Sequence, residues 1–108
     1  GIFSYPSTGI YFIKFVAQIH SPSQGATYAG GAIQTTADNS TYNNAAVNQS
    51  SIYHSNGYGQ GVMSFIHDVT NTTNDKVRFQ AECEFAADAV GNTGQNTTYV
   101  SFIRLGDT

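Results

Sequence analysis

The chain has 108 residues, which suits one domain with its own hydrophobic core, and it carries a net charge of −3 with only four basic residues. So few basic residues cannot form a basic patch, so binding of nucleic acid through its phosphates is not expected. The single cysteine excludes an internal disulfide, and the longest apolar stretch, Gly9–Ala17, is too short to cross a bilayer.

Uncharged polar residues stand where most protein surfaces carry charges. Charged residues make up 10% of the chain, against about a quarter in a typical domain. This composition is typical of secreted or virion-borne modules and predicts an extracellular or virion-surface location. The chain starts without methionine and without a signal-like segment. We therefore expect residues 1–108 to be a single head domain, the C-terminal part of a longer polypeptide.

The first predicted strand is Gly9–His20, which follows a turn containing Pro6. Its odd-numbered positions from Tyr11 to Ile19 are all apolar, which predicts a buried face. Half of its even-numbered positions are apolar as well, which a solvated face would not need. We therefore expect both faces of this strand to be covered.

Two less regular strands follow at Thr27–Thr36 and Ala45–His54. The next strand, Gln60–Val69, again carries apolar residues on both faces. Clusters of Gly, Pro, Ser, Asn and Asp between these segments indicate turns. No helical periodicity is found, so the predicted chain consists of strands and turns.

The strand Lys76–Phe85 alternates strictly and has one apolar face, which predicts one buried and one solvated side. The last strand, Thr97–Leu105, is apolar on both faces. The residues expected on the buried face of Lys76–Phe85 are Val77, Phe79, Ala81, Cys83 and Phe85.

These strands predict an all-β protein, an antiparallel two-sheet sandwich or jelly roll. Three strands are apolar on both faces, so we expect these three to share a sheet whose outer face is covered. Large exposed apolar faces usually mark interfaces, which favours self-association. A long loop folded over that sheet, or another part of the parent polypeptide, would cover it equally well.

Three short motifs begin or form these strands. They are Pro6-Ser7-Thr8-Gly9-Ile10-Tyr11, Asn74-Asp75-Lys76-Val77 and Thr98-Tyr99-Val100-Ser101-Phe102-Ile103. They resemble the proline-x-x-glycine-x-tyrosine opening of the central strand, the glycine-aspartate-x-valine turn and the final strand of the jelly-roll superfamily that contains the complement component 1q globular head and tumour necrosis factor. Asn74 and Ser101 stand where glycine is common in that family.

The resemblance implies a ten-strand jelly roll assembled as a compact homotrimer. In the family the central, final and pre-turn strands lie in the inner sheet, which faces the threefold axis, and the strand after the turn lies in the outer sheet. The family's opening strand is expected before Gly1, or from a neighbouring segment. By position in the motifs, Tyr11, Ile13 and Phe15 are expected in the core. The residues expected at the trimer interface are Ile10, Phe12, Lys14, Val16, Tyr99, Ser101 and Ile103.

The ending Ser101-Phe102-Ile103-Arg104-Leu105-Gly106-Asp107-Thr108 resembles the ends of tail-fibre and other structural proteins of marine bacteriophages. This resemblance implies a trimeric virion-fibre head that mediates attachment, with a host-surface protein or glycan as its partner. Two alternatives are a virion decoration or capsid-assembly module without a receptor, and a secreted complement or tumour necrosis factor-like ligand head.

Enzymatic activity is not expected. His67 and Asp68 are adjacent on a predicted strand, so they point to opposite faces and cannot form a catalytic dyad. No nucleophile elbow or phosphate loop is present.

No cofactor is expected, and calcium is considered as an alternative because some members of the resembled family bind it at the trimer apex. The spacing of the aspartates fits no known metal loop, and Asp75 is better explained as the residue that fixes its turn. The aspartates considered as ligands are Asp38, Asp68, Asp75, Asp88 and Asp107.

The polar and aromatic segment from Ser40 to Gly61 is the candidate ligand-binding region. Tyr and Asn combine contact area with hydrogen bonding at small entropic cost, which suits recognition. The same tyrosines would also be explained by contacts with the sandwich itself, and a protein ligand is not distinguished from a sugar. The candidate residues are Tyr42, Tyr53, His54, Asn56 and Tyr58.

Overall fold

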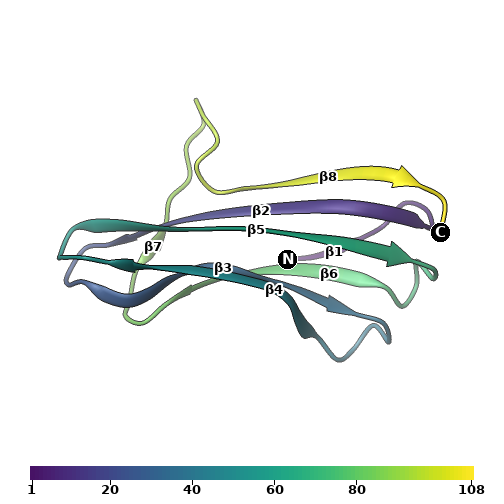
Figure 1. Cartoon of the computed structure of the whole chain (residues 1–108), viewed down its shortest axis with the longest axis horizontal. Coiled ribbons are helices and arrows are strands. Elements are labelled where there is room, and N and C mark those ends of the chain that lie inside the picture. Colours follow the sequence, from purple (N-terminus) through teal and green to yellow (C-terminus); the bar gives the residue numbers. More distant parts are fainter.

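The computed structural model describes residues 1–108 and shows an all-β protein (Figure 1). Its antiparallel strands form two sheets that lie one upon the other. It contains no helix of the length and apolar character needed to cross a membrane. The strands are β1 (Ile2–Ser4), β2 (Gly9–Ser21), β3 (Ala26–Thr36), β4 (Asn43–Ile52), β5 (Gly57–Val69), β6 (Lys76–Cys83), β7 (Asp88–Ala89) and β8 (Tyr99–Gly106).

The first sheet has the strand order β1-β6-β3-β4, and the second is centred on β2. Along its whole length β2 pairs with β5 on one side, while β8 and the short β7 pair with its other side. The strands predicted to be apolar on both faces are β2, β5 and β8, and they share one sheet. The one-sided strand, β6, lies in the other sheet. The expected division of these strands between the two sheets is therefore confirmed, while the cover expected over the outer face is not provided by the single chain.

The core lies between the sheets and is built around the odd-numbered residues of β2. Ile13 is fully buried, and Tyr11 and Phe15 are almost fully buried, as predicted. They meet Ile33 of β3 and Val77 of β6, which are also fully buried. Burying each of these large apolar side chains contributes about 1.5–3 kcal/mol, so this cluster is the main source of stability.

The sandwich is closed along the flank where β4 meets β5. A Cβ atom at Gly61 would collide with the carbonyl oxygen of Asn48, so only glycine allows the two strands to approach this closely. The free edge of β5 is capped by side chains of β4. The backbone N–H of Val62 donates to Asn48 Oδ1 at 3.0 Å, and that of Gln60 donates to Ser50 Oγ at 3.0 Å.

The opposite flank, between β1 and β6 of one sheet and β7 and β8 of the other, is open. No side chain of the molecule hydrogen-bonds to the backbone of β8, so the edge of β8 that faces away from β2 is uncapped. Phe102 of β8 lies on the core side of the sheet, opposite Ile13, and is still 38% exposed. This flank therefore lacks the cover that β4 and β5 give each other.

The open flank explains why one prediction was partly wrong. The strand expected at Lys76–Phe85 ends at Cys83, and only its first half has a buried inner face. Val77 is fully buried, Phe79 and Cys83 are half-buried, and Ala81 and Phe85 are exposed. The alternation indicated correctly which way these side chains point. How deeply they are buried depends on the neighbouring strands, and no strand covers the end of β6 near Cys83.

Candidate interaction surface

The outer face of the sheet centred on β2 carries three cross-strand rows of side chains. We call these rows, together with Ile10, the β2 face. All seven residues predicted to face a partner lie on it, although one of them, Val16, is only 4% exposed and is thus already buried within the single chain. In the order β5, β2, β8, the rows are Ile66, Phe12 and Ile103; then Ser64, Lys14 and Ser101; then Val62, Val16 and Tyr99.

Aliphatic side chains on the β2 face are open to solvent. Ile66 is 58% exposed, Ile103 is 55% exposed and Val62 is 46% exposed. Phe12, between the two isoleucines, is only half-buried. The solvated face of an antiparallel sheet normally carries polar residues at such positions. Exposed apolar rows of this kind suit contact with another molecule better than contact with water.

A polar row crosses the middle of this apolar face. Lys14 lies between Ser64 and Ser101, and its Nζ atom is 5.9 Å from the centre of the Tyr99 ring. Lys14 takes part in neither of the two ion pairs of the molecule. A covered lysine needs hydrogen-bond partners to avoid a large desolvation cost. Any surface that covers the β2 face must therefore match the position of this row, which restricts how two molecules can fit together.

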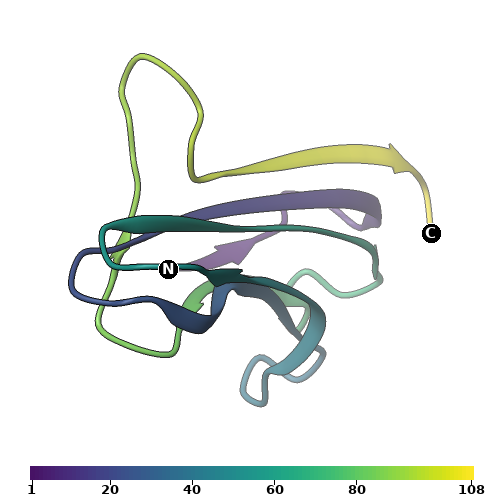
Figure 2. The ribbon, with the colours of Figure 1, turned by 60° about the vertical axis from the view of Figure 1, so that its left-hand side comes forward.

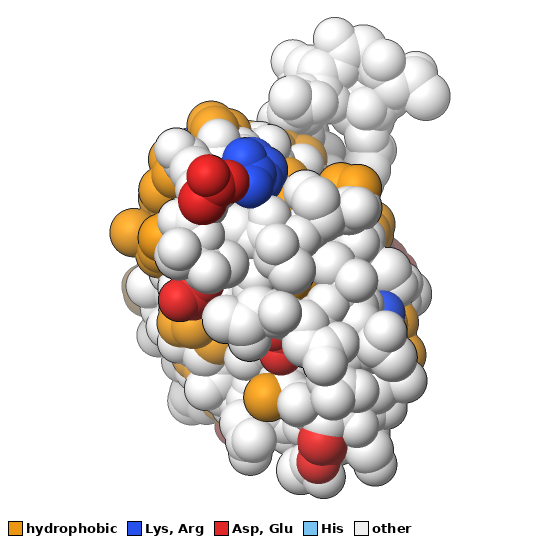
Figure 3. All heavy atoms as spheres, turned by 90° about the vertical axis from the view of Figure 1, so that its right-hand side faces the viewer, with side chains coloured by type: hydrophobic (Ala, Val, Ile, Leu, Met, Phe, Trp, Pro, Cys, Tyr) orange, Lys and Arg blue, Asp and Glu red, His pale blue; other side chains and the backbone are white.

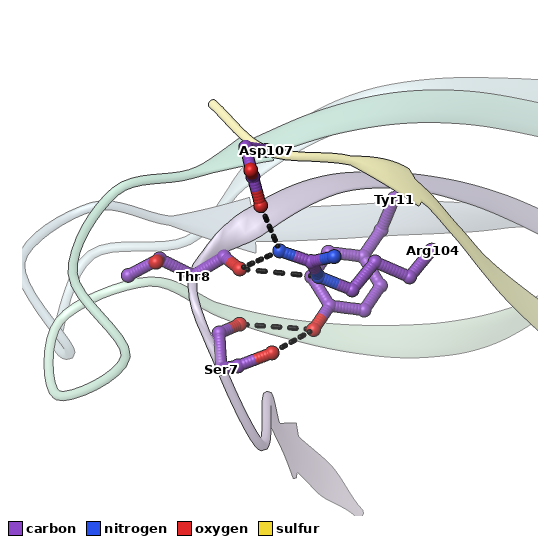
Figure 4. A network of polar contacts seen from close by, with 5 residues as sticks. All are labelled: Ser7, Thr8, Tyr11, Arg104 and Asp107. Atoms are coloured by element: carbon purple, nitrogen blue, oxygen red, sulfur yellow. Dashed lines mark hydrogen bonds and ion pairs between the residues drawn. The ribbon is translucent and has the colours of Figure 1, made fainter.

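Arg104 fastens the end of β8 to the start of β2 (Figure 4). Its guanidinium group donates two hydrogen bonds to the carbonyl oxygen of Thr8, at 3.2 and 2.9 Å, and one to Asp107 at 2.8 Å. Close by, the Tyr11 hydroxyl donates to the carbonyl oxygen of Ser7 at 2.9 Å. These bonds hold β8 in register with β2. They help to keep the rows of the β2 face aligned.

A smaller polar cluster surrounds His20 near the end of β2. His20 Nε2 lies 2.7 Å from Asn56 Oδ1, and His20 Nδ1 lies 3.6 Å from Asp88 Oδ2. The ring centres of His20 and Tyr58 are 4.8 Å apart. Asn56 and Tyr58 were predicted as ligand-binding residues. The cluster joins them to a histidine and a carboxylate that sequence reasoning did not associate with them.

The other predicted ligand-binding residues lie elsewhere. Tyr53 is 96% exposed, and its ring centre is 5.6 Å from that of His54. Tyr42 lies beside the other sheet, where the Arg78 guanidinium is 4.1 Å from the centre of its ring. The structure therefore places four of the predicted ligand-binding residues in or directly beside the β4–β5 turn, and it places Tyr42 apart from them beside the other sheet.

His67 pairs with a tyrosine and makes no hydrogen bond with Asp68. The Tyr5 hydroxyl lies 2.8 Å from His67 Nδ1. Burial raises the pKa of Tyr5, and the nearby Asp75 and Tyr11 raise it further. Burial lowers the pKa of His67, an effect that Asp75 and Asp68 oppose. This hydrogen bond therefore joins two neutral groups in the folded chain.

The aspartates considered as calcium ligands do not gather into one site. No group of three His, Cys, Asp or Glu side chains is placed to hold a metal ion. Asp75 Oδ2 accepts hydrogen bonds from the backbone N–H groups of Thr70 and Asn71 at 2.9 and 3.0 Å, which confirms that it fixes its turn. Asp38 accepts from the Thr41 backbone N–H and from other groups of its own loop, and these bonds lower its pKa to about 2.

The open flank contains an exposed aromatic cluster. The ring centres of Phe3, Phe79 and Phe102 lie 5.5 to 5.9 Å from one another. Beside them is a cavity of about 240 Å³ that is also lined by Tyr5 and Tyr11. Edge-to-face aromatic contacts of this kind stabilise the fold by about 0.5–1.5 kcal/mol each beyond simple burial. Here they are formed at a surface that water can reach.

In comparisons with known proteins, no family model, no curated protein and no solved structure matches this chain.

Proposed function

We propose that the chain is a non-catalytic, homotrimeric head of a virion fibre, exposed on the virion and attaching it to a host-surface protein or glycan. The β2 face is the observation that carries this proposal. Its exposed isoleucine and valine residues lie on β5 and β8, on either side of β2, where burial against another copy would remove them from water.

The strand arrangement supports the jelly-roll part of the proposal. The resemblance in the sequence expects the central, pre-turn and final strands to share the sheet at the threefold axis. These strands are β2, β5 and β8, and they do share one sheet. The strand after the Asp75 turn is β6, which lies in the other sheet, as the resemblance expects.

The chemistry of the β2 face favours identical copies as the cover. The polar row consists of one ammonium group between two hydroxyl groups. The Ser64 and Ser101 hydroxyls of a neighbour would provide acceptors for Lys14, so another copy supplies the partners that this row needs. A contact between copies also puts apolar rows against apolar rows. A partner with a basic or strongly acidic surface would leave those rows unmatched.

Sedimentation equilibrium of the chain tests the assembly. We expect a single species with three times the monomer mass of 11.6 kDa. A folded monomer at every concentration would contradict the proposal. Binding of the trimer to glycan arrays and to host cells then tests attachment, for which saturable binding is expected.

A virion decoration or assembly module is the second candidate, and one observation favours it. The predicted ligand-binding residues do not form one recognition surface, because Tyr42 lies apart from the four residues at the β4–β5 turn. A decoration module would form the same trimer and show no saturable binding to glycans or cells. The two candidates are thus separated by the binding measurement and not by the mass.

A further inference from the structure

The connection between β7 and β8 leaves the body of the molecule. In Figures 1 and 2 it rises beyond β8, on the side away from β3, β4 and β6. Figure 3 shows it from another direction as a projection without hydrophobic or charged side chains. We call residues 91–96 of this connection the projecting loop. All six residues are exposed.

The base of the projecting loop is fixed to β2. The Val90 N–H donates to the carbonyl oxygen of Gln18 at 2.8 Å, and the Thr97 hydroxyl donates to the carbonyl oxygen of Val90 at 2.7 Å. On the return strand, the Thr98 hydroxyl accepts a hydrogen bond from the Gln18 N–H at 3.1 Å. Because both ends of the loop are held at one point of β2, the loop leaves the sheet in a defined direction.

The tip, by contrast, has almost no contacts within its own chain. Its one hydrogen bond runs from the Gly94 N–H to Asn92 Oδ1, within the tip itself, at 2.7 Å. A Cβ atom at Gly91 would meet no atom within 4 Å. The tip offers amide and hydroxyl groups from Asn92, Thr93, Gln95 and Asn96. Such groups can exchange their hydrogen bonds with water for hydrogen bonds across a contact, at a modest net gain for each bond formed.

The loop base is continuous with the β2 face. Tyr99, the first residue of β8, directly follows the loop base and forms a row with Val16 and Val62. A molecule seated on this face would therefore reach the loop at the end of that row. The loop extends away from the other sheet, so it rises beside the molecule that covers the face.

We propose that the projecting loop clasps a neighbouring copy of this chain. This inference rests on the proposed self-association through the β2 face. The loop forms uncharged hydrogen bonds at the edge of an apolar contact, so it strengthens the assembly with little dependence on salt. Its own chain does not need these contacts to fold.

Shortening the projecting loop tests whether it contacts a neighbouring copy. Residues 92–95 are replaced by one glycine, and the association constant is measured by sedimentation equilibrium. We expect it to fall at least about tenfold, which the loss of one or two interfacial hydrogen bonds would produce. The same change is also made together with Phe12→Asp, which puts a carboxylate on the β2 face and should keep the chain monomeric. In that monomer the shortened loop should leave the unfolding temperature unaltered, because the tip makes no contact with the rest of its own chain. A trimer with an unchanged association constant would overturn the clasp and leave the proposed function standing. A monomeric wild-type chain would overturn both.

Cross-linking gives a second test that does not depend on how the shortened chain folds. Thr93→Cys in the loop and Thr73→Cys in the turn after β5 are each made in a Cys83→Ala chain, so that each protein has one thiol. A thiol-attached photo-cross-linker should join two chains through position 93 and much less through position 73. Equal cross-linking at the two positions would overturn the inference.

Discussion

Phe12 is the largest apolar side chain of the β2 face, and it lies between Ile66 and Ile103 on the neighbouring strands. The chain itself only half-buries it. Its contribution to folding is therefore limited by its remaining exposure, while its contribution to a contact between copies would be large. A substitution at this position separates the two roles.

The Phe12→Asp variant should be monomeric at concentrations at which the wild-type chain is a trimer. A carboxylate buried in the contact without a partner costs about 3 kcal/mol or more per site. Val47→Asp is the matched control, because Val47 is 47% exposed on β4 in the other sheet. Light scattering should give the wild-type mass for the control alone. The assigned face would be wrong if Phe12→Asp kept that mass.

His67 gives the fold a dependence on pH. Burial lowers its pKa below the ordinary value of 6.5, so the folded chain binds a proton less readily than the unfolded chain does. The unfolded state gains protons first as the pH falls through 6.5, so stability should decrease from about pH 7.5 down to the lowered pKa of the folded chain. Thermal unfolding at a series of pH values measures this loss.

The His67→Gln variant should show a smaller loss of stability over the same range. His54→Gln is the control, because His54 is exposed and should keep the wild-type dependence. An unfolding temperature of the wild-type chain that does not change with pH would contradict the role assigned to His67.

At the scale of the strands, the closed flank depends on Gly61. Its backbone lies against the carbonyl oxygen of Asn48, with no room for a side chain. The Gly61→Ala variant should lose about 1–3 kcal/mol of stability, because β4 and β5 must move apart to accept the methyl group. Gly106→Ala is the control, since a Cβ atom there would meet no atom within 4 Å. Urea unfolding of both variants measures the difference, and equal losses would contradict this account.

The longer strands could be predicted from the sequence because alternation of apolar residues is a local signal. β2, β3, β5 and β6 were found with bounds close to those observed, and β4 begins two residues before the predicted Ala45. β1 and β7 were missed, since strands of three and two residues are too short to show a period. Their pairing is decided by the sheets that they join.

The β2 face could be placed from the sequence for the same reason. Once a strand has period two, the residues that share a face follow directly. The polar clusters could not be placed in this way. His20 and Asp88 meet because β7 pairs with the end of β2, and no sequence pattern indicated that pairing. Tyr42 precedes β4 and Asn56 follows it, so the two residues lie at opposite ends of this strand. Because they are close in the sequence, they were predicted to belong to one region.

For the whole molecule, the main asymmetry is between its two flanks. The edge of β5 is capped by Asn48 and Ser50, whereas the free edge of β8 is uncapped. In the Phe12→Asp monomer, the amides of β8 that do not bond to β2 should therefore exchange with solvent faster than those of Gln60 and Val62. Hydrogen exchange read by NMR measures both sets. Equal protection of the two edges would show that the open flank is covered in solution.

The pairing of β2 with β8 also has a consequence for the order of events during folding. Phe12 and Ile103 are neighbours in the sheet, yet every other strand except β1 lies between them along the chain. Contacts so distant in sequence form slowly, because the whole intervening chain must be ordered first. During synthesis, β2 can pair with β5 long before β8 has left the ribosome. The surface proposed for assembly is then completed last, so each chain has to finish folding before it can join its neighbours.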